Sequence, residues 1–312
     1  MKNLTLRQFR YFEAVARLRH FGRAAEDCAV TQPALSMQIK ELEETLGVAL
    51  LERTARQVQL TGFGEVLLAH ARKVLRAVDE IESMARAAAG DPSGALRIGV
   101  IPTIAPYLLP AIIARLQVLY PDLQPWPRET ITPRLLEELI DGRLDAAILA
   151  LPVSEPALTE VPLFTERFVL VRPLADAGRP TPSPQNLTEM RLLLLEEGHC
   201  FRDQALSFCG PAAARPREIL DGSTLSTLVQ MVGAGIGVTL IPEMAVPVET
   251  RSAPVAISRF RDPQPARSIG MVWRRSNPQE TQLRQIAGVV RAAGLALRDA
   301  GGLVHPPGWR RG

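Results

Sequence analysis

Two cysteines, Cys200 and Cys209, lie nine positions apart in the second half of the 312-residue chain. Cys200 follows an apolar run and a glycine, and His199 and Arg202 lie beside it in the sequence. A helix that begins at Cys200 and two neighbouring cationic side chains would each favour the ionised thiolate, which is the nucleophilic form of cysteine. We therefore expect Cys200 to react with peroxide.

A metal site and a catalytic dithiol are two other uses of cysteine, and neither fits this spacing. A site made of His199, Cys200 and Cys209 would need a fourth ligand, and its spacing is not that of the common zinc motifs. Thioredoxin-like enzymes carry two cysteines separated by two residues, a pattern that the chain lacks. The third cysteine, Cys28, is interpreted as a small buried hydrophobe. We expect no metal and no other cofactor.

The spacing of the two cysteines has a geometric consequence. If residues 200–209 formed one continuous helix, the two Cα atoms would lie roughly 13 Å apart, whereas a disulfide needs them within ~7 Å. A bond between these cysteines would then require the segment to refold. Oxidation coupled to such a rearrangement is the kind of two-state element that a switch needs.

The composition limits the class of protein that carries these cysteines. The chain is 46% hydrophobic and has a formal net charge of +3, which is too small for a protein that coats nucleic acid without specificity. Three cysteines rule out a secreted disulfide framework. Neither a membrane-spanning run nor an apolar signal core occurs, so we expect a cytoplasmic location and no membrane partner.

The prolines divide the chain into a helical first part and a mixed second part. Pro33 is the only one of the 26 prolines before residue 90, and a cluster of turn-forming residues at 90–94 predicts a hinge. We expect a DNA-binding domain at 1–60, a dimerisation helix at 61–89, this hinge, a regulatory domain at 95–300 and a disordered tail at 301–312.

The regulatory domain has the pattern of an α/β fold. Short apolar runs at 96–101 and 144–149 alternate with helical patterns at 110–120 and 133–141, which predicts parallel strands with crossover helices. Two further predicted strands, at 164–171 and 268–273, are placed to cross between two lobes. The predicted lobes comprise about residues 95–163 with 268–300, and about residues 164–267.

The first 60 residues contain the pattern of a winged helix-turn-helix. A short helix over 21–28 is followed by a three-residue turn and by a second helix that begins near Thr31. The residues expected to contact DNA from this second helix are Thr31, Gln32, Pro33, Ser36 and Lys40. Residues 50–60 predict a two-stranded wing with Arg53 and Arg56 near its tip, placed to contact phosphate or the minor groove. An ordinary surface helix pair is the alternative for this segment.

A long helix is expected after the wing. Its apolar residues recur alternately four and three positions apart, which is a heptad pattern. The expected dimer residues are Leu67, Ala71, Val74, Val78 and Ile81. Two heads joined in this way would bind a quasi-palindromic site on double-stranded DNA. A helix that packs only along its own domain is the alternative.

The head resembles the LysR-type transcriptional regulators over almost its full length. The matching segments are Phe21-Gly22-Arg23-Ala24-Ala25, Thr31-Gln32-Pro33-Ala34-Leu35-Ser36, Ile39, Leu42-Glu43, Leu46-Gly47, Leu50-Leu51-Glu52-Arg53, Leu60-Thr61 and Gly64. The resemblance implies an all-α winged helix-turn-helix head, a linker helix, and a two-lobed α/β effector domain of the type 2 periplasmic-binding-protein kind. It also implies a dimer that assembles further into a tetramer.

Within that family, the chain is similar to the OxyR-like peroxide sensors as far as about residue 295. The matching segments are Ile101-Pro102-Thr103, Pro106-Tyr107-Leu108-Leu109-Pro110, Gly198-His199-Cys200, Arg202-Asp203-Gln204-Ala205, Cys209, Gly235 and Gly237. The resemblance implies that Cys200 is the peroxidatic cysteine and Cys209 the resolving one. The residues that it places in the peroxide pocket are Thr103, Thr132, His199, Arg202, Asp203 and Arg267. Two departures from the pattern are Pro133-Arg134 after Thr132, and Phe201 where leucine is usual.

These observations predict a DNA-binding activator or repressor, not an enzyme, that a reversible Cys200–Cys209 disulfide switches in response to hydrogen peroxide. Its expected partners include RNA polymerase and cytosolic thiol reductants. One alternative is a regulator that binds a small organic anion between its lobes, with incidental cysteines. A cysteine peroxidase is the other. Loss of two thiols on peroxide titration, no loss, or catalytic peroxide consumption would distinguish the three.

Overall fold

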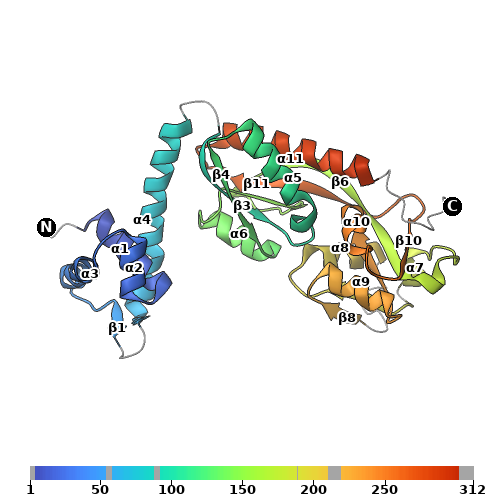
Figure 1. Ribbon diagram of the computed structural model, residues 1–312, viewed down its shortest axis with the longest axis horizontal. Coiled ribbons are helices and arrows are strands. Elements are labelled where there is room, and N and C mark those ends of the chain that lie inside the picture. Colours follow the sequence, from blue (N-terminus) through green and yellow to red (C-terminus); the bar gives the residue numbers. More distant parts are fainter. Residues whose placement is uncertain (1–3, 54–57, 88–91, 188, 210–218, 302–312) are drawn as a thin grey trace. The chain divides into compact units, whose positions relative to one another are not determined.

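The computed structural model describes residues 4–53, 58–87, 92–187, 189–209 and 219–301. These residues fall into two units, one within Met1–Ala85 and the other within Arg86–Gly312, coloured blue to cyan and cyan to red in Figure 1. Arg56, part of the expected hinge and the tail beyond residue 301 lie outside the described residues, as does the side chain of Arg53. No helix in the described ranges combines the length and apolar character needed to cross a membrane.

The described part of the first unit contains a small wing, most of the long helix α4 (Gly62–Ala87) and three shorter helices. The shorter helices are α1 (Leu6–Leu18), α2 (Phe21–Asp27) and α3 (Gln32–Leu46). Thr5 and Gln8 begin α1 with a reciprocal capping box, and α3 ends at Gly47, whose φ of 72° suits glycine. The side chains that are fully buried between the helices include Phe12, Val15, Leu35, Ile39 and Leu42. The expected helix-turn-helix is therefore confirmed.

The wing follows α3 and is held by a carboxylate from it. Strands β1 (Leu51–Arg53) and β2 (Val58–Leu60) pair antiparallel. Glu43 accepts hydrogen bonds from the backbone N–H groups of Leu50 and Leu51, at 2.8 and 3.2 Å. The long helix α4 (Gly62–Ala87) begins directly after β2. Glu43 thus ties the start of the wing to the C-terminal half of α3.

A nine-stranded sheet runs through the second unit. Eight strands lie in the order β4-β3-β5-β11-β6-β9-β7-β8, and β10 pairs with β6. Their bounds are β3 Gly94–Val100, β4 Leu123–Glu129, β5 Ala146–Leu151, β6 Leu158–Pro173, β7 Leu192–Leu195, β8 Ile219–Gly222, β9 Val238–Pro242, β10 Val255–Ser258 and β11 Ala266–Arg274. β3 is parallel to β4 and β5, and β7 is parallel to β8 and β9. The expected parallel strands with crossover connections are confirmed.

Two long strands connect the two lobes. Lobe 1 is built on β3, β4 and β5, and lobe 2 on β7, β8 and β9, while β6 and β11 pair with each other antiparallel between them. β11 also pairs with β5, whereas the 16-residue strand β6 continues to pair with β9 and β10. The expected crossing of these two strands between the lobes is confirmed.

Helices cover the sheet in both lobes (Figure 1). In lobe 1 they are α5 (Ala105–Leu119), α6 (Thr132–Ile140) and α11 (Glu280–Gly301). Lobe 2 contains α7 (Pro184–Leu187), α8 (Cys200–Cys209), α9 (Leu225–Gly233), α10 (Val246–Glu249) and two 3-10 turns, Leu174–Asp176 and Glu243–Ala245. The helix expected from residue 110 begins five residues earlier, at Ala105. Pro110 lies inside α5, whose buried residues on both sides of it fix the helix against the sheet.

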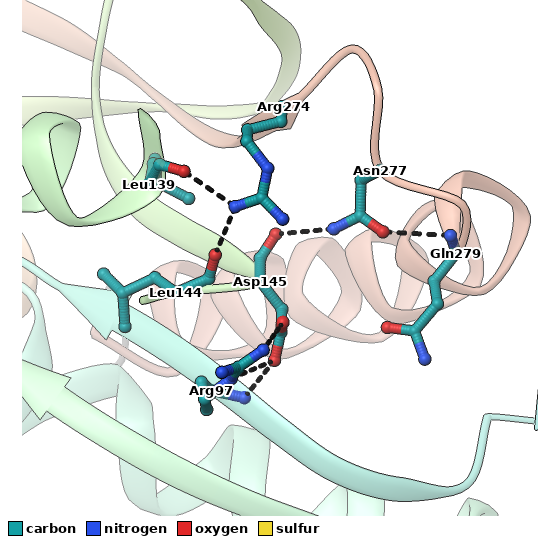
Figure 2. Close-up of polar contacts among 7 residues, drawn as sticks. All are labelled: Arg97, Leu139, Leu144, Asp145, Arg274, Asn277 and Gln279. Atoms are coloured by element: carbon teal, nitrogen blue, oxygen red, sulfur yellow. Dashed lines mark hydrogen bonds and ion pairs between the residues drawn. The ribbon is translucent and has the colours of Figure 1, made fainter. Parts of the chain in front are cut away.

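A dense polar cluster joins the start of β5 to the turn before α11 (Figure 2). The Asp145 carboxylate accepts three hydrogen bonds from Arg97, at 2.7 Å from the backbone and 3.2 and 2.8 Å from the guanidinium. Asn277 donates to the backbone carbonyl of Asp145, and Arg274 donates to the carbonyls of Leu139 and Leu144. We call this group the Asp145 cluster. It fixes lobe 1 at the edge from which β5 starts.

Candidate functional site

Three segments that follow parallel strands meet at a small pocket. Thr103 follows β3, Thr132 is the first residue of α6 after β4, and Cys200 is the first residue of α8 after β7. The pocket is lined by Ile101, Pro102, Thr103, Ile131, Thr132, His199, Cys200 and Phe201. In α/β folds, ligands bind where the carboxyl ends of parallel strands meet helix N-termini, because the unpaired N–H groups there favour negative charge. Cys200 therefore lies at the kind of position where α/β folds bind their ligands.

The turn before Cys200 depends on a glycine. Gly198 has a φ of 91°, which side chains with a Cβ rarely adopt. A Cβ at this position would also lie 2.9 Å from Cδ1 of Ile131, which lines the pocket from lobe 1. Gly198 thus lets the β7–α8 turn approach lobe 1 closely enough to bring Cys200 to the two threonines.

The pocket is narrow and incompletely hydrogen-bonded. Its free space has no room for the centre of a water-sized sphere. The Oγ1 atom of Thr132 is buried and has no hydrogen-bond partner among the described residues. A buried hydroxyl without a partner costs free energy. The unpartnered hydroxyl of Thr132 is therefore a candidate to bind a ligand in the pocket.

His199 is half-buried beside Cys200. Burial lowers the pKa of its imidazole, and this effect outweighs the opposing influence of Glu196. The ring is therefore neutral near pH 7. Burial thus disfavours the positive charge that the sequence predicts His199 to offer the thiolate. A neutral imidazole can still donate or accept one hydrogen bond in the pocket.

Arg202 and Asp203 lie next to Cys200 in the sequence but not in the pocket lining. The guanidinium of Arg202 donates to the backbone carbonyl of Leu195 at 2.8 Å, and Asp203 is exposed to solvent. A helix turns by about 100° per residue, so Arg202, two positions after Cys200, points in another direction, whereas Asp203, three positions after it, shares its face but is exposed. Arg202 instead joins the start of α8 to the end of β7.

Arg267 reaches the pocket wall from the long strand β11. It is fully buried, and its guanidinium forms an ion pair with Glu166 at 2.7 Å. It also donates to the Oγ1 and backbone carbonyl of Thr103, at 2.8 and 3.1 Å, and lies 5.3 Å from the ring centroid of Phe201. Burial raises the pKa of Glu166, and Arg267 opposes that rise.

Cys209 lies at the opposite end of α8 from Cys200. It is buried, and burial raises the pKa of its thiol to about 11. Cys28, Cys200 and Cys209 are all free thiols. Residues Cys200–Cys209 form one continuous helix, as the geometric argument assumed, which puts the Cα atoms roughly 13 Å apart. Both thiols belong to a single helix that keeps them separate.

The outward side of α3 carries the residues expected to contact DNA. Thr31, Gln32, Pro33 and Lys40 are exposed and Ser36 is half-buried. Thr31 has the backbone position of the N-cap, but its side chain makes no capping hydrogen bond. Lys40 forms only a surface ion pair with Glu44, at 3.6 Å. These side chains are accessible to a groove or to phosphates.

The residues expected to form the dimer seam differ in exposure along α4. Leu67 packs against the hydrophobic core of the head, and Ala71 is buried in that core with only 1% of its surface exposed. Ala71 is therefore not available to a second chain, which corrects that assignment. Val78 is half-buried, whereas Val74 is 40% exposed and Ile81 is 65% exposed. The expected dimer residues that do not pack in the core of the head therefore begin at Val74.

Sequence reasoning did not identify Glu43 or Glu166. Glu166 lies on β6 between Phe164 and Phe168, and all three are buried on the same side of the strand. An acidic residue at an inward position of an alternating strand is a signal that could have found it. The signal for Glu43 is weaker, because an acidic residue on a helix is common. Across the described ranges, no three His, Cys, Asp or Glu side chains gather as metal ligands would.

Two family models match almost the whole chain. Residues 6–65 match the bacterial regulatory helix-turn-helix protein model of the lysR family, and residues 89–294 match the LysR substrate binding domain. The chain belongs to the LysR family of bacterial regulatory proteins.

Individual relatives show which members of this family the chain resembles. A probable hydrogen peroxide-inducible genes activator from Streptomyces viridosporus is 45% identical over 95% of both chains. The DNA-binding transcriptional dual regulator OxyR of Escherichia coli K12 is 43% identical over 93% of this chain and 95% of that one.

Solved OxyR structures are similar as well. Full-length OxyR from Pseudomonas aeruginosa, in a cysteine-to-aspartate variant, has a TM-score of 0.72 and 37% identity over 93% of this chain and 95% of that one. An H2O2-bound cysteine-to-serine variant of Corynebacterium glutamicum OxyR has a TM-score of 0.67 and 36% identity over 99% of both chains. This chain is thus an OxyR-like member of the family.

Proposed function

We propose that the protein is a peroxide-responsive transcriptional regulator of the cytoplasm, switched by a reversible disulfide between Cys200 and Cys209. The observation that carries the proposal is the placement of one thiol at a helix N-terminus, in a pocket with an unpartnered hydroxyl, and of the second thiol at the far end of that helix. The names of the relatives and of an H2O2-bound neighbour support the choice of hydrogen peroxide.

The first chemical step takes place inside the pocket. The Cys200 thiolate attacks one oxygen of hydrogen peroxide, the O–O bond breaks, and the other oxygen leaves as hydroxide and takes a proton to become water. Cys200 becomes a sulfenic acid. The hydroxyls of Thr103 and Thr132 and the neutral ring of His199 are the groups that can hold both peroxide oxygens. Because the free space of the pocket has no room for the centre of a water-sized sphere, the pocket must widen before hydrogen peroxide can enter.

The second step joins the two cysteines. The sulfur of Cys209 attacks the sulfur of the Cys200 sulfenic acid, which releases water and leaves a disulfide. Because an intact α8 keeps the Cα atoms roughly 13 Å apart, this step requires the helix to unwind. Reduction by two equivalents of a cytosolic thiol would restore both cysteines and the helix. The rearrangement of α8 is the proposed signal.

The proposed readout is a change in DNA binding. The residues of α3 and the wing, including Arg53 and Arg56, would contact a quasi-palindromic promoter site, with Val74, Val78 and Ile81 of α4 joining two chains. Assembly into a tetramer and contact with RNA polymerase follow from the family resemblance. Oxidation would alter how the paired heads meet the two half-sites.

A peroxide titration of the reduced full-length protein tests the proposal. We expect two of the three thiols to disappear at about one equivalent of peroxide, with a changed footprint on promoter DNA. Unchanged thiols would indicate the regulator of an organic anion instead. Catalytic peroxide consumption with a thiol reductant would indicate a peroxidase.

Three cysteine variants assign the roles. Cys200→Ser should lose no thiol and keep the reduced footprint, because serine is not ionised near neutral pH. Cys209→Ser should stop at a sulfenic acid that a dimedone-type reagent traps. Cys28→Ala is the control, and it should respond as the parent does. A disulfide or a footprint shift in Cys200→Ser would overturn the proposal.

A further inference from the structure

Glu166 and Arg267 are direct cross-strand partners on the two strands that connect the lobes. Their side chains are 4% and 0% exposed. One carboxylate oxygen of Glu166 accepts a hydrogen bond from Arg267 Nε at 2.8 Å and forms the ion-pair contact with Nη2 at 2.7 Å, and the other oxygen accepts the backbone N–H of Met244 at 3.2 Å. Because both oxygens are occupied and the site is buried, Glu166 allows Arg267 a single orientation.

That orientation determines which way the hydroxyl of Thr103 points. Arginine has only donors, so the Oγ1 atom of Thr103 accepts the bond from Arg267 Nη1. The second nitrogen of the guanidinium donates to the carbonyl of the same residue, which holds the backbone of Thr103 as well. The hydroxyl proton of Thr103 is then left to donate in another direction, and Thr103 lines the pocket of Cys200.

We propose that Glu166 is a positioning residue for the peroxide reaction and acts through Arg267 to fix Thr103 as a hydrogen-bond donor into the pocket. The donated bond would meet the oxygen that leaves as hydroxide, where negative charge develops as the O–O bond breaks. The inference rests on the proposed peroxide function and adds a residue about 100 positions away from Arg267 in the sequence.

Glu166→Gln is the principal variant. Glutamine keeps one acceptor oxygen, so either Arg267 or the N–H of Met244 loses its partner. The rate constant for oxidation of Cys200 by hydrogen peroxide should fall by between about 10-fold and 100-fold, as expected when a catalytic donor is misplaced. Alkylation of Cys200 by iodoacetamide, which needs no such donor, should change by less than about threefold.

Glu249→Gln is the matched control. Glu249 is also a buried glutamate, 8% exposed, and it accepts from the hydroxyls of Tyr107 and Ser226 rather than from Arg267. Its replacement should leave the peroxide rate constant within about twofold of the parent, because hydroxyl partners can reverse their hydrogen bonds. An equal loss of peroxide rate in both variants would overturn the inference.

A double-mutant cycle with Thr103→Val tests whether Glu166 acts through the hydroxyl of Thr103. If Glu166 acts through Thr103, Glu166→Gln should have little further effect on the peroxide rate once the hydroxyl is absent. Multiplicative effects of the two changes would overturn the route, and an equal fall in peroxide and iodoacetamide rates would reduce Glu166 to a structural role.

A second variant keeps the test decisive if Glu166→Gln does not fold. The pair Glu166→Gln with Arg267→Met removes the buried charges together, which proteins tolerate better than one unpaired charge. It should show the same selective loss of the peroxide rate, and a parental rate would overturn the inference. Failure of the proposed function would be distinguishable, because then the parent protein itself would not be oxidised at Cys200.

Discussion

The Asp145 cluster and the Cys200 pocket are two polar sites toward opposite ends of the same parallel strands. In the cluster, Asp145 precedes β5 and its carboxylate accepts three hydrogen bonds from Arg97. In the pocket, which lies beyond the other end of β3, the hydroxyl of Thr132 has no partner in the described part of the chain. The difference supports a stabilising role for the first site and the proposed role of the second as the peroxide site.

Removal of the Asp145 carboxylate should have the largest effect of the proposed substitutions, and it should act on the unfolding free energy. Asp145→Ala leaves three donors of Arg97 without their acceptor, and we expect the regulatory domain to lose about 2–4 kcal/mol of unfolding free energy. Denaturant unfolding measures this loss. The folded fraction should react with peroxide at the parental rate. A loss below about 1 kcal/mol would remove the distinction between the two sites.

Opening of α8, the helix that begins at the pocket, should depend on pH through Cys209. Below pH 9 the thiol is protonated in both the closed and the opened helix, so pH has no effect through this group. Between the ordinary value of 9.0 and the raised pKa of about 11, only the opened helix loses the proton, and opening of α8 should become easier by up to about tenfold per pH unit.

Amide hydrogen exchange of α8, compared with that of α9 in the same sample, measures this opening, because the intrinsic base catalysis of exchange affects both helices. The extra slope should vanish in Cys209→Ser. Equal slopes for the two helices of the parent protein would contradict the prediction.

Thr132→Val should have the opposite effects to Asp145→Ala: it should slow the peroxide reaction without a loss of stability. Valine replaces a buried hydroxyl that has no partner, so the unfolding free energy should stay the same or rise slightly. The rate constant of Cys200 with peroxide should fall about tenfold, which corresponds to one lost hydrogen bond. Stopped-flow oxidation and denaturant unfolding of one preparation provide both numbers. A stability loss without a rate effect would make Thr132 a structural residue.

Phe201→Leu should have the smallest effect and should act on the second chemical step. Phe201 is buried, and its ring packs edge-on against Phe168 with centroids 4.8 Å apart. A smaller side chain weakens the packing that holds α8 in place, so the sulfenic acid should convert to the disulfide about fivefold faster. The first step should be unchanged. Rapid-quench thiol trapping separates the steps, and a slower second step would contradict the role of this packing.

Local signals explain the features that could be predicted from the sequence. The start of α8 at Cys200, the short turn before α3 and the crossover units of lobe 1 depend on turn residues and periodicity within a short window. The predicted start of the helix at residue 110 was wrong, because a proline is normally excluded from the interior of a helix. Tertiary packing holds the proline inside α5 instead.

Long-range pairing explains what could not be predicted. The ion pair of Glu166 with Arg267 joins positions 101 residues apart and depends on the register of β6 against β11. Likewise, no sequence pattern shows that Ala71 is covered by the head. The sequence also did not show that Arg202, two positions after Cys200, donates to the backbone carbonyl of Leu195.

The position of β11 in the sheet has a consequence for synthesis on the ribosome. β11 lies between β5 and β6 in the sheet. Its residues, Ala266–Arg274, nevertheless leave the ribosome later than those of all the other strands described. The sheet therefore cannot close until translation is nearly complete, whereas the head finishes first from local contacts. A chain that ends before β11 would therefore carry the complete helix-turn-helix, Cys200 and Cys209, but neither Arg267 nor a closed sheet.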